Sequence, residues 1–141
     1  METFLLTLRK INFPVLASMA FNVLEILEPK QTSVWVANGK SRRVSFVYSD
    51  EEADKWLLKV LNSKGDIVHS YPADILFPEK RRERMIYEKY VIVPENLEGG
   101  EHKIRVCALL KDKRELCKDT ELFYIEGGQK TGKLNTRRLI T

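Results

Sequence analysis

The sequence contains few of the residues on which catalytic and metal sites depend. Its 141 residues include two histidines and two cysteines, and these do not cluster with the spacing of metal ligands. Neither His69 nor His102 lies near a plausible serine or cysteine nucleophile in the sequence. We therefore expect a protein that is not an enzyme and that binds no metal and no cofactor.

Long hydrophobic runs are also missing. No segment approaches the roughly twenty apolar residues of a membrane-spanning helix, so we expect no transmembrane segment. The apolar residues 1–20 make a poor signal peptide. Glu2 lies where such peptides are positively charged, the basic residues follow the first apolar stretch when they should precede it, and Pro14 interrupts the hydrophobic segment. As an N-terminal extension they form either an extra strand at residues 4–8 or a short helix at residues 15–20.

An excess of positive charge is confined to the C-terminal end. The net charge is +4, and residues 128–141 supply all of it through four basic residues and no acid, namely Lys130, Lys133, Arg137 and Arg138. The remaining residues are neutral overall. This distribution predicts a flexible basic tail over residues 127–141 and argues against nucleic acid as a partner of the folded part.

Alternation of apolar and polar residues begins at Phe21 and recurs along the chain. It is clearest in residues 97–126, where Ile104, Val106 and Ala108 share one parity and Arg105 and Cys107 share the other. Similar segments lie at residues 21–29, 33–39, 42–49, 55–61, 66–71 and 85–94. Strands at this spacing, without a helical pattern between them, predict a single all-β domain of two layers.

The last predicted hairpin brings the two cysteines together. Residues 111–113 lack apolar side chains and are the natural loop, and a three-residue loop places Cys107 opposite Cys117. Directly opposed side chains have Cβ atoms about 5 Å apart, close to the distance that a disulfide requires. The pattern thus predicts either a cross-strand disulfide or, if the loop has another length, two free and half-buried thiols.

This order of features resembles a bacterial immunoglobulin-like (fibronectin-like) domain over residues 21–126. The residues that carry the resemblance are a first strand at 21–29, Trp56 on the third strand, and the turn at 97–101 before the sixth strand. His102 occupies the corner position where such sandwiches often have a tyrosine, and the disulfide between sheets is absent. The resemblance implies an antiparallel β-sandwich of about seven strands, and it slightly favours an extracytoplasmic or cell-surface location.

Three other groups of residues have functional and structural interpretations. The glycine-rich residues 127–133 have the spacing of a phosphate-binding loop, but Leu134 stands where a magnesium-binding hydroxyl is needed. The acids at 50–54 lack the spacing of a calcium loop and suit a solvated loop. Trp35 points away from its neighbours, and it either packs against the N-terminal segment or contributes to a contact surface.

A possible basic contact surface for an acidic partner is the last candidate site. Its members are Lys80, Arg81, Arg82 and Arg84 in one loop and Lys130, Lys133, Arg137 and Arg138 in the tail. Glu79 and Glu83 interrupt the first group, so an ordinary charged loop is the favoured alternative. No aromatic platform for stacking bases accompanies it.

We therefore expect a non-catalytic protein-interaction or assembly module, such as a subunit of a surface, filament or other multiprotein structure. Sandwiches have edge strands with unpaired backbone groups, through which another chain is bound or the protein self-associates. Residues 1–20 are the predicted docking segment. The alternative is an accessory ligand-binding domain for carbohydrate or nucleic acid.

Overall fold

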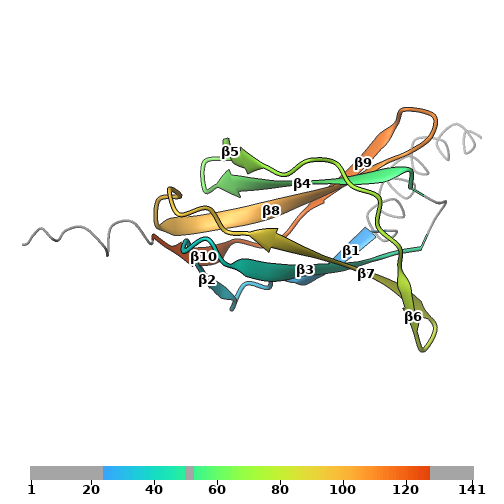
Figure 1. Cartoon of the computed structure of the whole chain (residues 1–141), viewed down its shortest axis with the longest axis horizontal. Helices are drawn as coiled ribbons and strands as arrows, with labels where there is room; N and C mark the ends of the chain where they lie inside the picture. Colours follow the sequence, from blue (N-terminus) through green and yellow to red (C-terminus); the bar gives the residue numbers. More distant parts are fainter. Residues whose placement is uncertain (1–23, 50–52, 128–141) are drawn as a thin grey trace, which may run out of the picture.

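The computed structural model describes residues 24–49 and 53–127. In these residues the regular secondary structure consists of ten β-strands in two sheets (Figure 1). The all-β prediction is thus confirmed for the described residues, and the strands are more numerous than the seven predicted. The predictions for residues 1–20, for the acids at 50–52 and for the tail beyond Gly127 lie outside the described residues.

Two sheets pack face to face. The first contains, in order, β1 (Leu24–Glu28), β3 (Ser41–Tyr48), β7 (Arg84–Ile92) and β6 (Glu79–Arg81). The second contains, in order, β2 (Val34–Val36), β10 (Phe123–Glu126), β8 (Gly100–Leu109), β4 (Lys55–Asn62) and β5 (Ile67–Ser70), and β9 (Glu115–Asp119) also pairs with β8. Only β2 and β10 pair in parallel among the described strands. This arrangement is compatible with a β-sandwich.

Aromatic rings join the two sheets at the centre of the core. Trp56 on β4 is 1% exposed, and its ring centroid lies 4.6 Å from that of Phe46 and 5.1 Å from that of Tyr48, both on β3. Tyr87 on β7 completes the group, with its centroid 5.0 Å from that of Trp56. Because large rings bury more apolar area than other side chains, this cluster fixes how the sheets face each other.

Trp35 lies in the core and not on a contact surface. It is 2% exposed, and its ring contacts that of Phe123 edge to face at 4.9 Å. The guanidinium of Arg42, on β3 in the opposite sheet, lies 5.8 Å from the ring centroid. Val34 is exposed and Val36 is half-buried on the other face of β2. The contact-surface interpretation was wrong because β2 faces the core with its tryptophan and directs its valines outward.

Tyr71, just after β5, ties the second sheet to the first. Its hydroxyl donates a hydrogen bond of 2.6 Å to the carbonyl of Ile92 at the end of β7. Burial raises the pKa of the Tyr71 hydroxyl to about 12. The group therefore stays protonated and able to donate throughout the neutral range.

The predicted final strand is divided in two. β9 and β10 both pair with the same side of β8, but Asp119 faces Arg105 whereas Phe123 faces His102. Three steps along β8 thus correspond to four along the partner, which is the one-residue excess of a β-bulge. Thr120 lies at the break, and its side-chain oxygen accepts a hydrogen bond of 3.0 Å from the N–H of Ile104.

Residues 72–84, which lie between two predicted strands, also contain secondary structure. Asp74 forms an isolated bridge with Trp56, and β6 pairs with the start of β7. All three residues of β6 are exposed, so no alternation of apolar side chains reveals the strand. Within the described residues, no helix has the length and apolar character needed to cross a membrane.

Candidate interaction surface

The β8–β9 hairpin is built as the sequence predicts. Its loop is the three residues Lys111, Asp112 and Lys113, and the N–H of Leu110 donates a 2.9 Å hydrogen bond to the carbonyl of Arg114. Lys113 has φ of 74°, the left-handed conformation that the last residue of such a loop requires. The loop length sets the register of everything that follows on β9.

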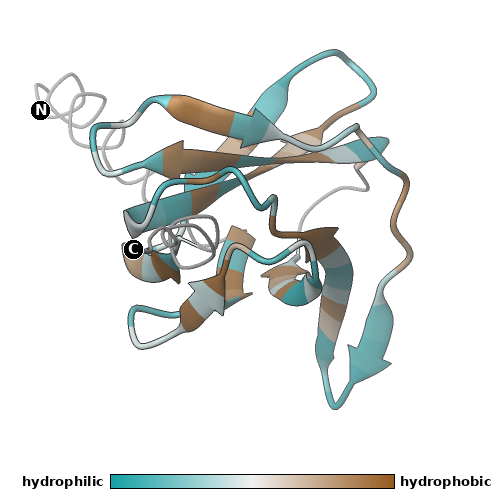
Figure 2. Ribbon diagram, turned by 60° about the vertical axis from the view of Figure 1, so that its left-hand side comes forward, coloured by the Kyte–Doolittle hydropathy of each residue, from teal (hydrophilic) through white to brown (hydrophobic). Residues whose placement is uncertain are grey.

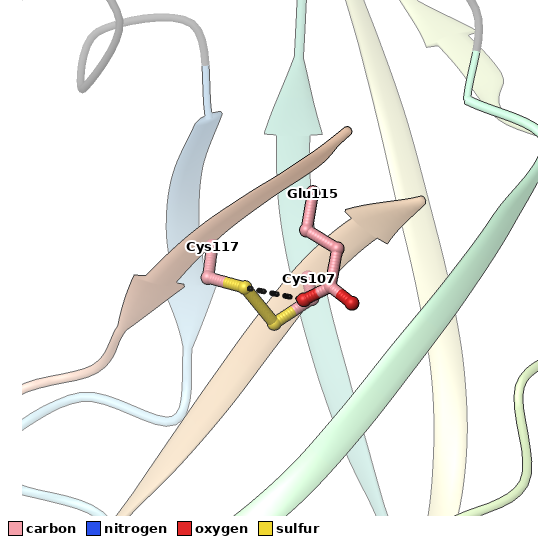
Figure 3. Close-up of side chains that lie close together, drawn as sticks. All are labelled: Cys107, Glu115 and Cys117. Carbon is pink, nitrogen blue, oxygen red and sulfur yellow. Dashed lines mark hydrogen bonds between the residues drawn. A yellow bond between two sulfur atoms is a disulfide. The ribbon is translucent and has the colours of Figure 1, made fainter. Parts of the chain in front are cut away.

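In this register Cys107 lies directly opposite Cys117. The structure joins them in a disulfide with an S–S distance of 2.07 Å (Figure 3). Backbone hydrogen bonds join Leu110 to Arg114 on one side of the cysteines and Ile104 to Thr120 on the other. Because hydrogen-bonded and non-hydrogen-bonded pairs alternate along the ladder, the cysteines form a non-hydrogen-bonded pair, in which opposed side chains are closest. The disulfide therefore closes the hairpin where the sheet geometry suits it.

Cys107, Cys117 and Glu115 form the one group among the described residues with ligand atoms close enough for a metal ion. A carboxylate oxygen of Glu115 lies 3.9 Å from Sγ of Cys117 (Figure 3). Metal ions bind the thiolate form of cysteine, and sulfurs joined in a disulfide have no thiolate to offer. The oxidised hairpin is therefore not a metal site.

An ion-pair cluster strengthens the same hairpin. Asp119 on β9 accepts hydrogen bonds from Arg105 Nε at 2.7 Å and Nη2 at 3.1 Å, and Lys103 Nζ lies 3.1 Å from one of its oxygens. Burial alone would raise the pKa of Asp119. The hydrogen bonds from Arg105 and Lys103 outweigh burial and hold that pKa below its ordinary value.

The outer edge of β9 has no partner strand among the described residues. Since Leu116 and Lys118 occupy the hydrogen-bonded positions facing β8, the N–H and C=O groups of Glu115, Cys117 and Asp119 point outward. The pairing of β9 with β8 has no register shift. Within the part of the chain that the structure describes, β9 thus presents a regular row of backbone donors and acceptors with no partner strand.

A groove of about 500 Å³ lies beside this edge, between the two sheets. One wall comes from β1 and the turn after it, and the other from the end of β9, and the lining includes Ile26, Pro29, Thr32, Lys118 and Thr120. It combines apolar surface with charges of both signs. An extended segment paired with β9 would have side-chain space here.

The predicted basic residues are only partly brought together. Lys80, Arg81, Arg82 and Arg84 lie on or beside the β6–β7 hairpin, and all four are exposed. Arg81 pairs with Glu79 at 2.8 Å and with Glu88 at 3.5 Å, and Arg84 pairs with Glu25 at 3.4 Å. Two of the four cations are therefore neutralised. Lys130, Lys133, Arg137 and Arg138 lie outside the described residues.

The two histidines have structural surroundings. Nδ1 of the buried His102 is 2.9 Å from the carbonyl oxygen of Gly100. His69 lies on β5 and its ring packs edge to face against Tyr71, with centroids 4.6 Å apart. These contacts do not bring either histidine together with an acid and a nucleophile.

No known family model matches this sequence, and no curated protein matches it either. The functional interpretation therefore depends on the geometry of the chain itself.

Sequence reasoning located the disulfide hairpin but not the edge beside it. The free edge depends on which strands lie next to β9 in space, and the groove depends on how β1 meets the other sheet. A sequence signal for this edge does exist. The three-residue loop that pairs the cysteines also determines that the backbone groups of Glu115, Cys117 and Asp119 point away from β8.

Proposed function

We propose that this chain is an immunoglobulin-like β-sandwich that acts as a non-catalytic protein-interaction or assembly module. Strand order supports the fold assignment. The order β1-β3-β7-β6 corresponds to the A-B-E-D sheet of immunoglobulin domains, and β10-β8-β4-β5 corresponds to G-F-C-C′. The parallel strand β2 continues the second sheet beyond β10.

Two core features also support this fold. Trp56 is buried on β4, the position of the conserved tryptophan on strand C. Phe46 on β3 stacks on Tyr87, its partner across the pairing of β3 with β7, with centroids 5.4 Å apart, and both rings pack against Trp56 of the other sheet. The contact between His102 and Gly100 serves in place of the tyrosine corner.

The observation that carries the interaction role is the free edge of β9. An extended segment of a partner protein would add a strand there, with main-chain hydrogen bonds to Glu115, Cys117 and Asp119. The disulfide and the Asp119 ion pairs hold β9 against β8 before the partner arrives, so less conformational entropy is lost on binding. The groove beside β1 would receive alternate side chains of the added strand.

The other edges of the described sheets are less suited to this role. The carbonyl of Val34 on β2 already accepts a 3.2 Å hydrogen bond from Arg42 Nη1. β6 is only three residues long and wholly charged. The pairings of β1 and β5 contain register shifts. Short, charged or irregular edges are the means by which proteins discourage strand addition. β9 carries three charged side chains in its five residues, but it is longer than β6 and pairs with β8 without a register shift.

Selection of peptides tests the proposal without a known partner. Peptides that bind the full chain are selected from a random library, and hydrogen exchange is then compared with and without the best binders. We expect new protection at the amides of Glu115, Cys117 and Asp119. Glu115→Pro should weaken binding at least tenfold, because it removes an outward donor while the ladder to β8 stays intact.

Glu115→Gln is the matched control, since it makes the same change of charge and keeps the N–H. It should bind the selected peptides as the wild type does. Peptides that protect other strands, or that bind Glu115→Pro unchanged, would contradict the proposal.

The docking role predicted for residues 1–20 stays a prediction. Comparing the mass in solution of the full chain with that of a chain lacking residues 1–20 tests it separately from β9. The alternative role, binding of carbohydrate or nucleic acid, also stays a prediction, and no contact described above favours it.

A further inference from the structure

The β6–β7 hairpin extends away from the body of the two sheets (Figures 1 and 2). Its two strands pair through Glu79–Arg81 and the first residues of β7, and Arg82 and Glu83 form the turn. All residues from 79 to 85 are exposed. The hairpin therefore adds little to the core, and its side chains are available to a partner.

The two faces of this hairpin differ in charge. Glu79, Arg81 and Arg84 share one face and are ion-paired, as described above. Lys80 lies directly opposite Met85, so these two share the other face. Met85 is 40% exposed, and neither Lys80 nor Arg82 has an ion pair among the described residues. One face is thus neutralised, the other combines Lys80 with the apolar Met85, and Arg82 lies at the turn.

Two exposed large apolar side chains precede β6 in the chain. Phe77 is 86% exposed and Ile75 is 55% exposed. Between them, Leu76 packs against the core, which directs its two neighbours toward solvent. An aromatic side chain exposed to this degree has little role in its own fold, so it marks a surface that meets something else.

The backbone at the tip gives an independent indication of function. Arg82 has φ of 59°, in the left-handed region, at a two-residue turn where glycine is strongly preferred. A non-glycine residue held in an unfavourable conformation is a frequent feature of functional sites. Here that residue is Arg82, a cation without an ion pair in residues 24–49 and 53–127, and it lies next to the exposed Glu83.

We propose that the β6–β7 hairpin docks on the anionic surface of a lipid bilayer. Lys80 and Arg82 would meet lipid phosphates and carboxylates, while Phe77 and Met85 enter the interfacial region. Combining a cation cluster with inserted apolar side chains is how peripheral proteins bind such surfaces. A projecting tip with no partner strand reaches a flat surface without obstruction by the sheets. This inference does not depend on the role of the β9 edge.

Vesicle binding tests the proposal. The full chain is mixed with phosphatidylcholine vesicles containing 30% phosphatidylserine, and with pure phosphatidylcholine vesicles, and the bound fraction is measured by sedimentation. We expect binding to the anionic vesicles that weakens as salt rises. The variant Lys80→Ser/Arg82→Ser should lose about 30-fold in affinity, since each cation near such a surface contributes about fivefold. Phe77→Ser should lose about tenfold.

The control variant is Lys64→Ser/Ile67→Ser at the β4–β5 turn, where an exposed lysine lies beside an exposed apolar residue. It should bind as the wild type does. No binding to the anionic vesicles, equal binding to both vesicle types, or equal loss in the control would overturn the proposal. So would binding to polyglutamate without binding to vesicles, which would point to an acidic protein partner.

Discussion

Two hairpins of this protein have opposite designs. In β8–β9 a disulfide joins the strands, Asp119 bridges to Arg105, and Leu116 packs against the core. In β6–β7 no covalent link exists, and every residue from 79 to 85 is exposed. Yet both turns contain a residue other than glycine at positive φ, Lys113 at 74° and Arg82 at 59°.

This difference indicates that stability and surface binding depend on different hairpins. Changes in β8–β9 should alter the free energy of unfolding, because that hairpin is part of the packed structure. Changes at residues 79–85 of the β6–β7 hairpin should leave stability almost unchanged and alter surface binding only.

Removal of the disulfide should have the largest effect. Cys107→Ser/Cys117→Ser should lower the free energy of unfolding by about 3 kcal/mol, since the bond closes a short loop in the unfolded chain. Denaturant unfolding measures the change. Adding reductant to the wild type should reproduce the loss and should not affect the serine variant. Free thiols in the untreated, denatured wild type would contradict the bond.

Truncation of one apolar side chain in each hairpin sharpens the comparison. Leu116→Ala should cost about 2 kcal/mol, because Leu116 packs against the core. Met85→Ala should change the free energy of unfolding by less than about 0.5 kcal/mol, because Met85 is exposed. Equal losses in the two variants would show that β6–β7 belongs to the cooperative core.

The ion pairs of the two hairpins should differ in their response to pH. Asp119→Asn should cost about 1 kcal/mol at neutral pH, because Asp119 accepts charge-assisted hydrogen bonds from Arg105. The folded-state pKa of Asp119 lies below its ordinary 3.8, so this contribution is present above that pH. It is lost as pH falls through the folded-state pKa.

Unfolding measured between pH 7 and pH 2 checks this prediction. The wild type and Asp119→Asn should converge at the acid end, and a constant difference would contradict the assignment. Glu79→Gln, which removes an exposed ion pair of the β6–β7 hairpin, should match the wild type at every pH.

The smallest effects should come from the two turns. Lys113→Gly and Arg82→Gly each remove the cost of a left-handed residue other than glycine, but they also make the unfolded chain more flexible. Because the first effect is larger than the second, each should stabilise the fold by about 0.5 kcal/mol. Their consequences for binding should differ. Arg82→Gly should weaken binding to anionic vesicles, whereas Lys113→Gly should not. If both variants lost binding to anionic vesicles, the two hairpins would not differ in the way proposed.

The sequence predicted the β8–β9 hairpin because two segments with apolar residues enclose a short loop that has none. Fixing that loop at three residues was enough to place Cys107 opposite Cys117. β6 escaped prediction because its strand is all charged, and the break between β9 and β10 escaped because residues 118–121 are all polar, so no apolar side chain marks the change of parity there.

The candidate site was predictable only in part, for a physical reason. Parity along β9 can be obtained from the sequence, but a free edge is a property of neighbouring strands distant in the chain. The same holds for the basic residues. Arg81 and Arg84 are neutralised by Glu88 and Glu25, which come from other strands, so the net charge of the loop overstates its cationic surface.

Residue-resolved hydrogen exchange of the free, oxidised protein tests the central claim most directly. A rigid β9 with an open outer edge predicts slow exchange at the amides of Leu116 and Lys118, and fast exchange at Glu115, Cys117 and Asp119. Uniformly slow exchange would mean that the edge is already occupied. Uniformly fast exchange would mean that β9 is not held against β8, and either result would contradict the account.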